Sequence, residues 1–295
     1  MTARVLVTGR TGQVGTELAR APWPAGLVPE VVGRETLDLA DPEHAAEVVR
    51  TGGYALVINP AAYTAVDKAE EEEDLAVHIN GEGPRALAMA CTDAGIPLIH
   101  VSTDYVFDGA KDGPYTEDDP VAPLGAYGRS KLAGEVAVRA ECARHVILRT
   151  AWVFSAHGKN FVKTMLRLAA EKPELRVVAD QHGSPTAAHD IARVLVEIAR
   201  QIVLEGRNDA WGTYHFAGAG PTTWHGFAEA IVAAQAERTG ARPPVHPITT
   251  AEFPTPARRP ANSVLSSARL EETFGITPRP WPDTLAEVLT DLGAA

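Results

Sequence analysis

Residues 3–15 read ARVLVTGRTGQVG, a short apolar run followed by three glycines that lie three residues apart. The apolar run is typical of a buried β-strand, and residues 12–20 have the pattern of a helix. Small residues in the turn, Gly9, Gly12 and Gly15, let phosphates approach the backbone, and a helix N-terminus offers free N–H groups. Although the spacing is GxxGxxG and not GxGxxG, its place between strand and helix predicts a dinucleotide site.

The same alternation continues through the first half of the chain. Further strands are expected at residues 31–33, 55–61, 97–103 and 145–154, with helices at 42–50, from 62 up to 94, and from 127. Strands that are apolar throughout and separated by helices predict an α/β fold with a Rossmann-type, doubly wound parallel sheet. We expect this domain over residues 1–152, with some later segments returning to it, and a smaller α/β lobe over residues 153–295.

The second half is less regular. Helices are expected at residues 160–171 and 187–202 and a strand at 176–179, whereas residues 206–223 are punctuated by glycine and proline. Residues 242–260 hold six prolines and little periodicity, which predicts a surface loop. Because loops often carry binding groups, this segment is a candidate for ligand contacts.

Composition narrows the function classes. The formal net charge of −11 argues against a general nucleic-acid or anionic-membrane surface. The sequence has no run near the roughly 18 apolar residues of a membrane span, and its start lacks a signal-peptide pattern, so we expect a cytoplasmic protein. Two cysteines, Cys91 and Cys142, make neither a disulfide framework nor a metal knuckle. Because the net charge of the chain is negative, an anionic ligand would need a local basic pocket.

Nucleotide preference is decided at the end of the second strand, where residues 31–35 read VVGRE. An acidic side chain there holds a ribose 2′-OH, and an arginine admits a 2′-phosphate. Arg34 occupies this place, so we predict that NADPH is used at least as well as NADH. Asp38 and Leu39 follow closely enough to reach the adenine, although Asp38 could instead cap the helix that begins near Pro42.

A catalytic group is indicated by Tyr127 and Lys131, which lie one helical turn apart on one face. A phenol with the usual pKa of about 10 is a poor acid–base catalyst at neutral pH, and a nearby ammonium lowers that pKa. Thr103 lies at the carboxyl end of a predicted strand, where open α/β sheets bind their ligands, and can donate a hydrogen bond to a substrate oxygen.

Several blocks of sequence together resemble a known family. They are residues 9–15, 59–70 (NPAAYTAVDKAE), 102–107 (STDYVF), 127–131 (YGRSK), 149–154 (RTAWVF), 180–186 (DQHGSPT) and 254–260 (PTPARRP). The chain resembles the dTDP-4-dehydrorhamnose reductases, within the extended short-chain dehydrogenase/reductase superfamily. The resemblance implies hydride transfer from NADPH or NADH to the C4 keto group of dTDP-4-dehydro-6-deoxy-L-mannose, which gives dTDP-L-rhamnose, the last step of its biosynthesis.

The resemblance also implies residue roles. Tyr127 would donate the proton, Lys131 would position Tyr127 and the cofactor ribose, and Thr103 would assist at the substrate oxygen. Asp104 and Trp152 would contact the sugar nucleotide. The Arg258–Arg259 pair would supply the basic pocket, with Arg259 as the substrate-binding residue. The residues expected along the cofactor are Gly9, Thr11, Gly12, Gln13, Val14, Arg34, Asp38, Leu39, Ala61, Ala62, Tyr63, Thr64, Tyr127 and Lys131.

Two departures from related patterns bear on this expectation. Related dehydratases carry a glutamate directly after the Thr-Asp pair, whereas this chain has Tyr105, which disfavours dehydration. Some family members hold Mg²⁺ through acidic groups at a subunit contact. Here Glu17 is present, but residues 187–190 read AAHD, and His189 would bind a hard cation less well than a carboxylate.

Two other functions stay open at this point. The chain could reduce another dTDP-4-keto-6-deoxyhexose, since the pose of the sugar decides the product. It could also be a non-catalytic NADP-binding regulatory subunit resembling that of methionine adenosyltransferase. The presence of Thr103, Tyr127 and Lys131 favours an enzyme. The expected partner is a small dTDP-sugar, with a homodimer as one expected state of the chain.

Overall fold

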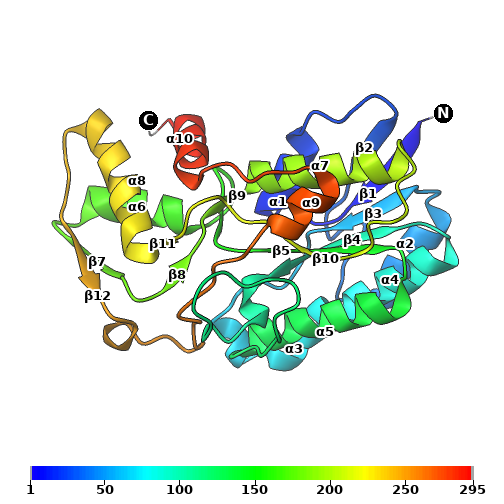
Figure 1. The fold of residues 1–295 in the computed structure, drawn as a ribbon, viewed down its shortest axis with the longest axis horizontal. Coiled ribbons are helices and arrows are strands. Elements are labelled where there is room, and N and C mark those ends of the chain that lie inside the picture. The colour runs from blue at the N-terminus through cyan, green and yellow to red at the C-terminus, as the bar shows by residue number, and fades with distance from the viewer. Residues whose placement is uncertain (1, 294–295) are drawn as a thin grey trace.

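A six-stranded parallel sheet forms the centre of the molecule (Figure 1). The computed structural model describes residues 2–293, apart from the side chain of Arg238. The strand order is β10-β5-β4-β3-β1-β2, and every neighbouring pair is parallel. The strands are β1 (Ala3–Val7), β2 (Leu27–Val31), β3 (Leu56–Asn59), β4 (Leu98–Thr103), β5 (His145–Thr150) and β10 (Gly212–His215). This sheet confirms the predicted Rossmann-type fold.

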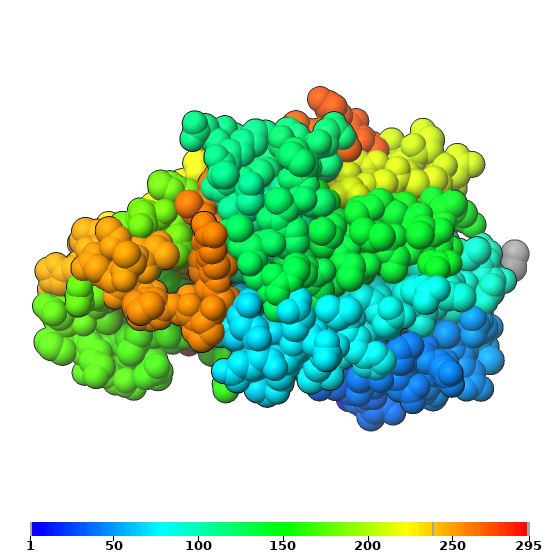
Figure 2. Space-filling view, turned by 90° about the horizontal axis from the view of Figure 1, so that it is seen from below, coloured from blue at the N-terminus to red at the C-terminus, as the bar shows by residue number. Residues whose placement is uncertain are grey.

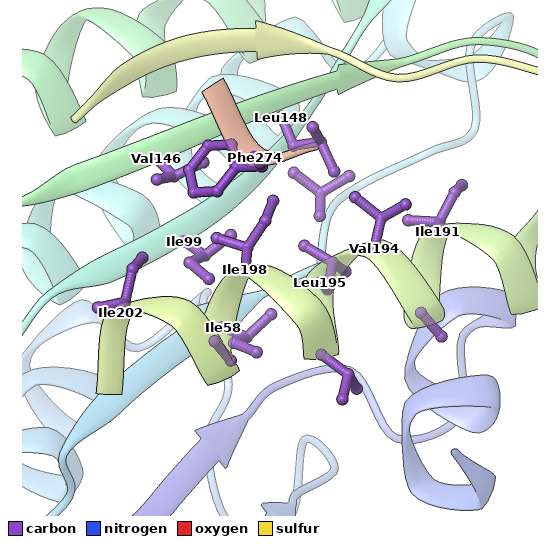
Figure 3. Packing of buried hydrophobic residues seen from close by; sticks show 14 of the residues in the cluster. Ile58, Ile99, Val146, Leu148, Ile191, Val194, Leu195, Ile198, Ile202 and Phe274 are labelled. Atoms are coloured by element: carbon purple, nitrogen blue, oxygen red, sulfur yellow. The ribbon is translucent and has the colours of Figure 1, made fainter. Parts of the chain in front are cut away.

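Helices cover both faces of this sheet. One face packs against α1 (Gln13–Arg20), α7 (Ala188–Val203) and α9 (Ala268–Phe274), and the other against α2 (Pro42–Thr51), α4 (Gly83–Asp93) and α5 (Ala126–Glu141). Successive strand residues point to opposite faces, so strands buried on both sides must be apolar at every position. Figure 3 shows Leu195 and Ile198 of α7 in one cluster with the sheet residues Ile58 and Ile99.

The sequence pattern predicted one long helical stretch from residue 62 up to 94. The structure instead divides this stretch into shorter elements. The stretch contains η1 (Lys68–Glu70), α3 (Glu73–Val77) and a π-helical turn, η2 (His78–Glu82). Asn80 in that turn is buried and directed inwards. Its side chain accepts from the Tyr63 N–H at 2.7 Å and donates to the Tyr63 carbonyl and to Ser130 Oγ. The π-turn therefore ties the end of β3 to α5, and π-turns often occur at such functional positions.

The second lobe is built from small sheets and three helices. The strands pair as β6 (Val153–Phe154) with β9 (Thr186–Ala187), β7 (Leu175–Val178) with β12 (Val245–Ile248), and β8 (His182–Gly183) with β11 (Thr222–Thr223). The helices are α6 (Phe161–Glu171), α8 (Trp224–Thr239) and α10 (Trp281–Asp291). Their apolar faces meet in a separate core that includes Phe154, Val162, Phe227 and Leu285. This lobe lies beside the carboxyl ends of the central strands (Figure 1).

Several predicted boundaries were wrong. The second strand is Leu27–Val31 and not residues 31–33, because its pairing with β1 begins at Ala3 and Leu27. The fifth strand ends at Thr150, since Trp152 adopts a positive φ of 47°. The stretches expected to be irregular contain β10 and β12, both of which gain hydrogen bonds only from distant strands. The division of the chain at residue 152 stays a prediction, but α7, β10 and α9 belong to the first core.

The segment after η4 (Thr250–Glu252) connects the two parts of the molecule. In Figure 2 this segment (orange) runs between the second lobe and the body formed by the first half. Its backbone bonds to both: the Ser263 N–H donates to the His182 carbonyl at 2.7 Å, and the Tyr115 N–H donates to the Val264 carbonyl at 2.8 Å. In the described part of the chain, no helix is both long enough and apolar enough to cross a membrane.

Candidate functional site

A cleft of about 650 Å³ opens at the carboxyl ends of the central strands, between the body and the second lobe. This is the edge at which open α/β sheets bind ligands. Most of the residues predicted from the sequence line it, namely Gly9, Thr11, Gly12, Gln13, Val14, Arg34, Asp38, Leu39, Ala61, Ala62, Thr64, Thr103, Asp104, Tyr127, Lys131 and Trp152. Residues from 9 to 152 in the sequence are therefore brought to one cavity.

The glycine turn forms one end of this cleft. Gly9 has a φ of +74°, and a Cβ on Gly15 would lie 2.0 Å from the Gly9 carbonyl oxygen, so only glycine lets α1 approach the strand end this closely. Gly12 is the N-cap of α1 and supplies no side chain to bond the first-turn N–H groups. These N–H groups at a helix N-terminus fit the pyrophosphate of a dinucleotide.

The end of β2 carries the residues expected to choose the nucleotide. Arg34 is exposed and lines the cleft, while its neighbour Glu35 accepts a hydrogen bond at 2.6 Å from Arg10. Asp38 also lines the cleft and accepts from the Ala40 N–H at 3.0 Å. The alternative role of Asp38 as a helix cap is wrong, because Asp41 caps α2 through the His44 N–H.

Lys131 is almost completely buried in α5. Its Nζ donates a hydrogen bond to the Val101 carbonyl at 2.8 Å, which fixes the side chain against β4. Burial lowers the pKa of Lys131 to about 8, and the carboxylate of Glu135, one turn further along α5, opposes this shift. Lys131 is therefore charged at neutral pH but close to its titration range.

Tyr127 behaves differently from the expectation. Burial raises the pKa of Tyr127 above its usual value, the nearby Asp104 carboxylate adds to the rise, and only a hydrogen bond with Thr103 opposes it. Lys131, whose ammonium donates to the Val101 carbonyl, does not lower the pKa of Tyr127. The phenol is thus protonated at neutral pH, which is the form that a proton donor requires.

Thr103 and Asp104 lie where β4 ends and η3 (Asp104–Val106) begins. Thr103 Oγ1 donates to Asp104 Oδ1 at 2.9 Å and accepts from the Tyr105 N–H at 3.2 Å. Burial raises the pKa of Asp104 to about 6, although hydroxyls of Ser263 and Thr103 partly offset it. Tyr105, which replaces the glutamate of dehydratases, packs edge-to-face against Tyr127 with ring centres 5.5 Å apart.

An aromatic wall, made of Trp152, Phe161 and Trp224, lines the opposite side of the cleft. Trp152 is the only non-glycine with a positive φ among residues 2–293. Its ring stacks on Trp224 with centroids 3.6 Å apart and an 8° angle between planes. A Cβ at Gly183 would lie 2.3 Å from the Trp152 ring, so a glycine is required there. The surrounding packing holds this strained backbone, and such strain is concentrated at functional sites.

Sequence reasoning missed Phe161, Trp224 and the cleft residue Lys159. No local motif marks Phe161 or Trp224, since each begins a helix of the second lobe and reaches the cleft only through the packing of that lobe. Their position was therefore accessible only from the folded chain.

Three predicted residues, Tyr63 and the pair Arg258 and Arg259, do not line the cleft, and Arg258 is exposed. Tyr63 bonds through its backbone to Asn80 and through its hydroxyl to Glu72 Oε2 at 2.8 Å. Arg259 makes two hydrogen bonds of 2.8 Å to the Asp67 carboxylate, and it also donates to the Ala257 carbonyl. The Arg259 guanidinium is thus already neutralised in the structure.

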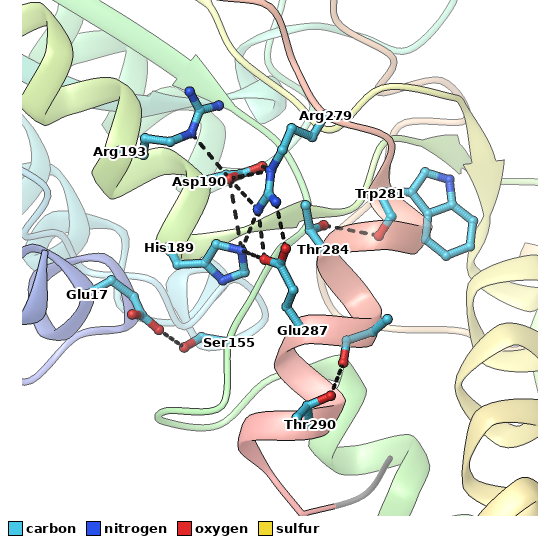
Figure 4. A network of polar contacts seen from close by, with 11 residues as sticks. Glu17, Ser155, His189, Asp190, Arg193, Arg279, Trp281, Thr284, Glu287 and Thr290 are labelled. Carbon is cyan, nitrogen blue, oxygen red and sulfur yellow. Dashed lines mark hydrogen bonds and ion pairs between the residues drawn. The ribbon is translucent and has the colours of Figure 1, made fainter. Parts of the chain in front are cut away.

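The residues considered for Mg²⁺ do not fit a cation site (Figure 4). Asp190 is bound by Arg279 at 2.8 Å, and the same arginine binds Glu287. His189 lies 3.0 Å from Glu287, while Glu17 accepts from Ser155. Within residues 2–293 no group of three His, Cys, Asp or Glu side chains could hold a metal. A guanidinium already supplies the positive charge that a metal would bring.

Comparison with known proteins finds relatives over nearly the whole sequence. Residues 3–294 match the family described as "RmlD substrate binding domain". The dTDP-4-dehydrorhamnose reductase of Sinorhizobium fredii is 46% identical over 281 residues, which are 95% of each chain. Among solved structures, the Clostridium acetobutylicum dTDP-4-dehydrorhamnose reductase has a TM-score of 0.90 at 40% identity, covering 98% of this chain and 99% of that one.

A second similar structure was solved with NADP bound. The Bacillus anthracis dTDP-4-dehydrorhamnose reductase in complex with NADP has a TM-score of 0.89 at 34% identity, covering 99% of this chain and 100% of that one. The family match and these high-coverage relatives agree over nearly the whole sequence. The chain belongs to the dTDP-4-dehydrorhamnose reductase family.

Proposed function

We propose that this protein reduces the C4 keto group of dTDP-4-dehydro-6-deoxy-L-mannose to give dTDP-L-rhamnose, using NADPH or NADH. The observation that carries the proposal is the single cleft that holds Thr103, Tyr127 and Lys131 at one wall and the glycine turn at its end. The cleft also contains Tyr105 in place of the acid that a dehydratase needs. The similarity to dTDP-4-dehydrorhamnose reductases supports the same substrate class.

The protein residues divide the work between binding and proton transfer. A bound reduced nicotinamide would supply the hydride, and the N–H groups after Gly12 together with Lys131, which line the cleft, would hold the cofactor. As C4 is reduced, its oxygen gains negative charge and takes the phenolic proton of Tyr127. Thr103 lies beside Tyr127, and its hydroxyl, which donates to Asp104 in the structure, would turn to donate to the same oxygen. Lys131, one helical turn along α5 from Tyr127, is assigned to the cofactor ribose.

The remaining contacts follow from position and charge. Asp104 and Trp152 line the cleft and are assigned to the sugar, and the exposed Arg34 is assigned to the 2′-phosphate of NADPH. We assign Arg259 to the nucleotide diphosphate, which requires its exchange from Asp67 to the phosphate. A homodimer and a cytoplasmic location stay predictions. Mg²⁺ has no part in the proposal.

The test combines purified protein, NADPH and dTDP-4-dehydro-6-deoxy-L-mannose. Absorbance at the nicotinamide band should fall, and NMR should identify the product as the L-rhamnose nucleotide. Loss of absorbance with a product of different C4 stereochemistry would favour another 4-ketoreductase. Tight NADPH binding without any loss of absorbance would instead contradict an enzyme and favour the regulatory-subunit alternative.

A further inference from the structure

A buried chain of polar side chains lies behind Lys131, on the side away from the cleft. Lys131 Nζ is 3.4 Å from His100 Nε2, and His100 Nδ1 is 3.0 Å from Asn59 Nδ2. Thr8 Oγ1 lies 2.6 Å from Asn59 Oδ1 and completes the chain. These groups come from α5, β4, β3 and the end of β1, so the chain crosses the sheet beneath the glycine turn.

This polar chain is isolated from water. Thr8, Asn59 and His100 have no exposed surface, and Lys131 is 2% exposed. None of the first three lines the cleft, so a ligand would not contact them. Buried polar groups without partners are costly, and each member here is bonded to the next. His100 is neutral, because burial and the nearby Lys131 and His145 hold its pKa well below the usual value.

The hydrogens of this chain can be arranged in two directions. In one direction, the Thr8 hydroxyl donates to Asn59, and Asn59 donates to His100 Nδ1. The hydrogen on His100 Nε2 then points at Lys131, which must be a neutral amine to accept it. An amide keeps its shape when its oxygen and nitrogen exchange places, and a neutral imidazole has two tautomers. In the reversed direction, His100 Nδ1 donates to Asn59, and Nε2 accepts from the Lys131 ammonium.

We propose that His100, oriented by Asn59 and Thr8, is a positioning residue that provides Lys131 with a hydrogen-bond partner in both of its protonation states. Without such a partner, the buried amino group would keep only its hydrogen bond to the Val101 carbonyl. The effect on enzyme kinetics rests on the proposed function. The change of His100 tautomer does not, because it takes place in the protein without cofactor or substrate. His100 touches neither substrate nor cofactor and acts only through Lys131.

Other charged and titratable groups near Lys131 set the size of the expected effect. On α5 these are Tyr127 and Glu135, and on η3 it is Asp104. On β5, Arg149 bonds Glu135 at 2.7 Å, and His145 lies near His100. Arg149 offsets part of the Glu135 charge, which itself favours the ammonium form of Lys131. A hydrogen bond to a charged group is stronger than a neutral one, so loss of His100 costs the ammonium more than the amine.

The kinetic test compares His100→Phe with His100→Gln in the full-length enzyme. In His100→Phe, the limb of the kcat/KM profile that belongs to Lys131 should move to lower pH by about one unit. Cofactor KM should rise while Tyr127-dependent chemistry is retained. His100→Gln can both donate and accept, so its profile should stay near that of the parent. His225→Phe, on α8, is a matched control that should leave the profile unchanged. A profile of His100→Phe equal to the parent would overturn the proposal.

A spectroscopic test covers the case in which His100→Phe does not fold. ¹⁵N-histidine NMR of the cofactor-free protein should show the His100 proton on Nδ1 below about pH 8 and on Nε2 above it, following the titration of Lys131. Comparison with His100→Gln identifies the signal. In Lys131→Met the change with pH should disappear. A His100 tautomer that does not respond to pH in the parent protein would overturn the proposal, even if the reductase activity is confirmed.

Discussion

The two walls of the cleft are built in different ways. The polar wall, made of Thr103, Asp104, Tyr127 and Lys131, comes from the end of β4 and one face of α5. The aromatic wall comes from three separated segments of the second half and includes a strained Trp152. Proton chemistry needs fixed spacing within a buried, bonded framework. Recognition of the sugar needs only a shaped surface, which distant segments can supply together.

This difference predicts different consequences of substitution. Changes in the polar wall should alter the chemical step or the charge state of the protein, because its groups are buried and linked by hydrogen bonds. Changes in the aromatic wall should alter substrate affinity and leave the chemical step largely intact. Substitutions in the polar wall should therefore have the larger effects.

Tyr127→Phe should give the largest effect. It removes the proton donor and keeps the ring, so kcat should fall about 10³-fold while cofactor affinity is retained. Steady-state kinetics and cofactor titration measure the two quantities. Tyr115→Phe is a matched control, since its hydroxyl bonds Asp108 outside the cleft. Parental turnover in Tyr127→Phe would mean that the proton comes from another group.

Asp104→Asn should stabilise the protein at high pH. The pKa of Asp104 is about 6 in the folded state and 3.8 in the unfolded state, because burial disfavours the carboxylate. The free energy of unfolding therefore falls as pH rises from about 4 to about 6. Removing this buried charge should raise the free energy of unfolding at pH 8 by on the order of 3 kcal/mol, an advantage that vanishes near pH 4. Denaturant unfolding at several pH values measures it.

Asp108→Asn provides a control of opposite sign. The pKa of Asp108 is lowered by the Ala110 N–H and by the Tyr115 hydroxyl, so this carboxylate stabilises the native state at high pH and loses that effect as pH falls. Asp108→Asn should therefore be less stable than the parent at pH 8. If both variants changed stability in the same direction, burial would not be the cause at Asp104.

Trp224→Ala should weaken sugar binding. It removes the stacked partner of Trp152 and should raise KM for the dTDP-sugar about tenfold, with a much smaller change in kcat. Trp211→Ala is the matched control, because Trp211 packs near Arg144 at the far side of the sheet. A fall in kcat with unchanged KM would break the distinction between the two walls.

Arg34→Ala should give the smallest effect. Arg34 is exposed, so its loss should lower the ratio of kcat/KM for NADPH to that for NADH only about fivefold. Glu35→Gln is expected to change this ratio in the opposite direction, since it releases Arg10 from its ion pair. An unchanged ratio in Arg34→Ala would remove the argument for an arginine-bound 2′-phosphate.

Much of the polar wall could be predicted because its signals are local. The glycine turn follows directly from the first strand, and Tyr127 and Lys131 lie one helical turn apart. The electrostatics could not be predicted in the same way. The rise in the pKa of Tyr127 comes from burial and from Asp104, which depend on how β4 and α5 pack.

The sequence by itself determined the parallel sheet, the glycine turn and the spacing of Tyr127 and Lys131 on one helix face, because each rests on a pattern within a few neighbouring residues. Tertiary structure alone decided the place of β10, the pairing of Arg259 with Asp67, the aromatic wall and the chain from Thr8 to Lys131. These features join residues far apart in the sequence. Their contacts depend on the packing of whole elements, which no local spacing encodes.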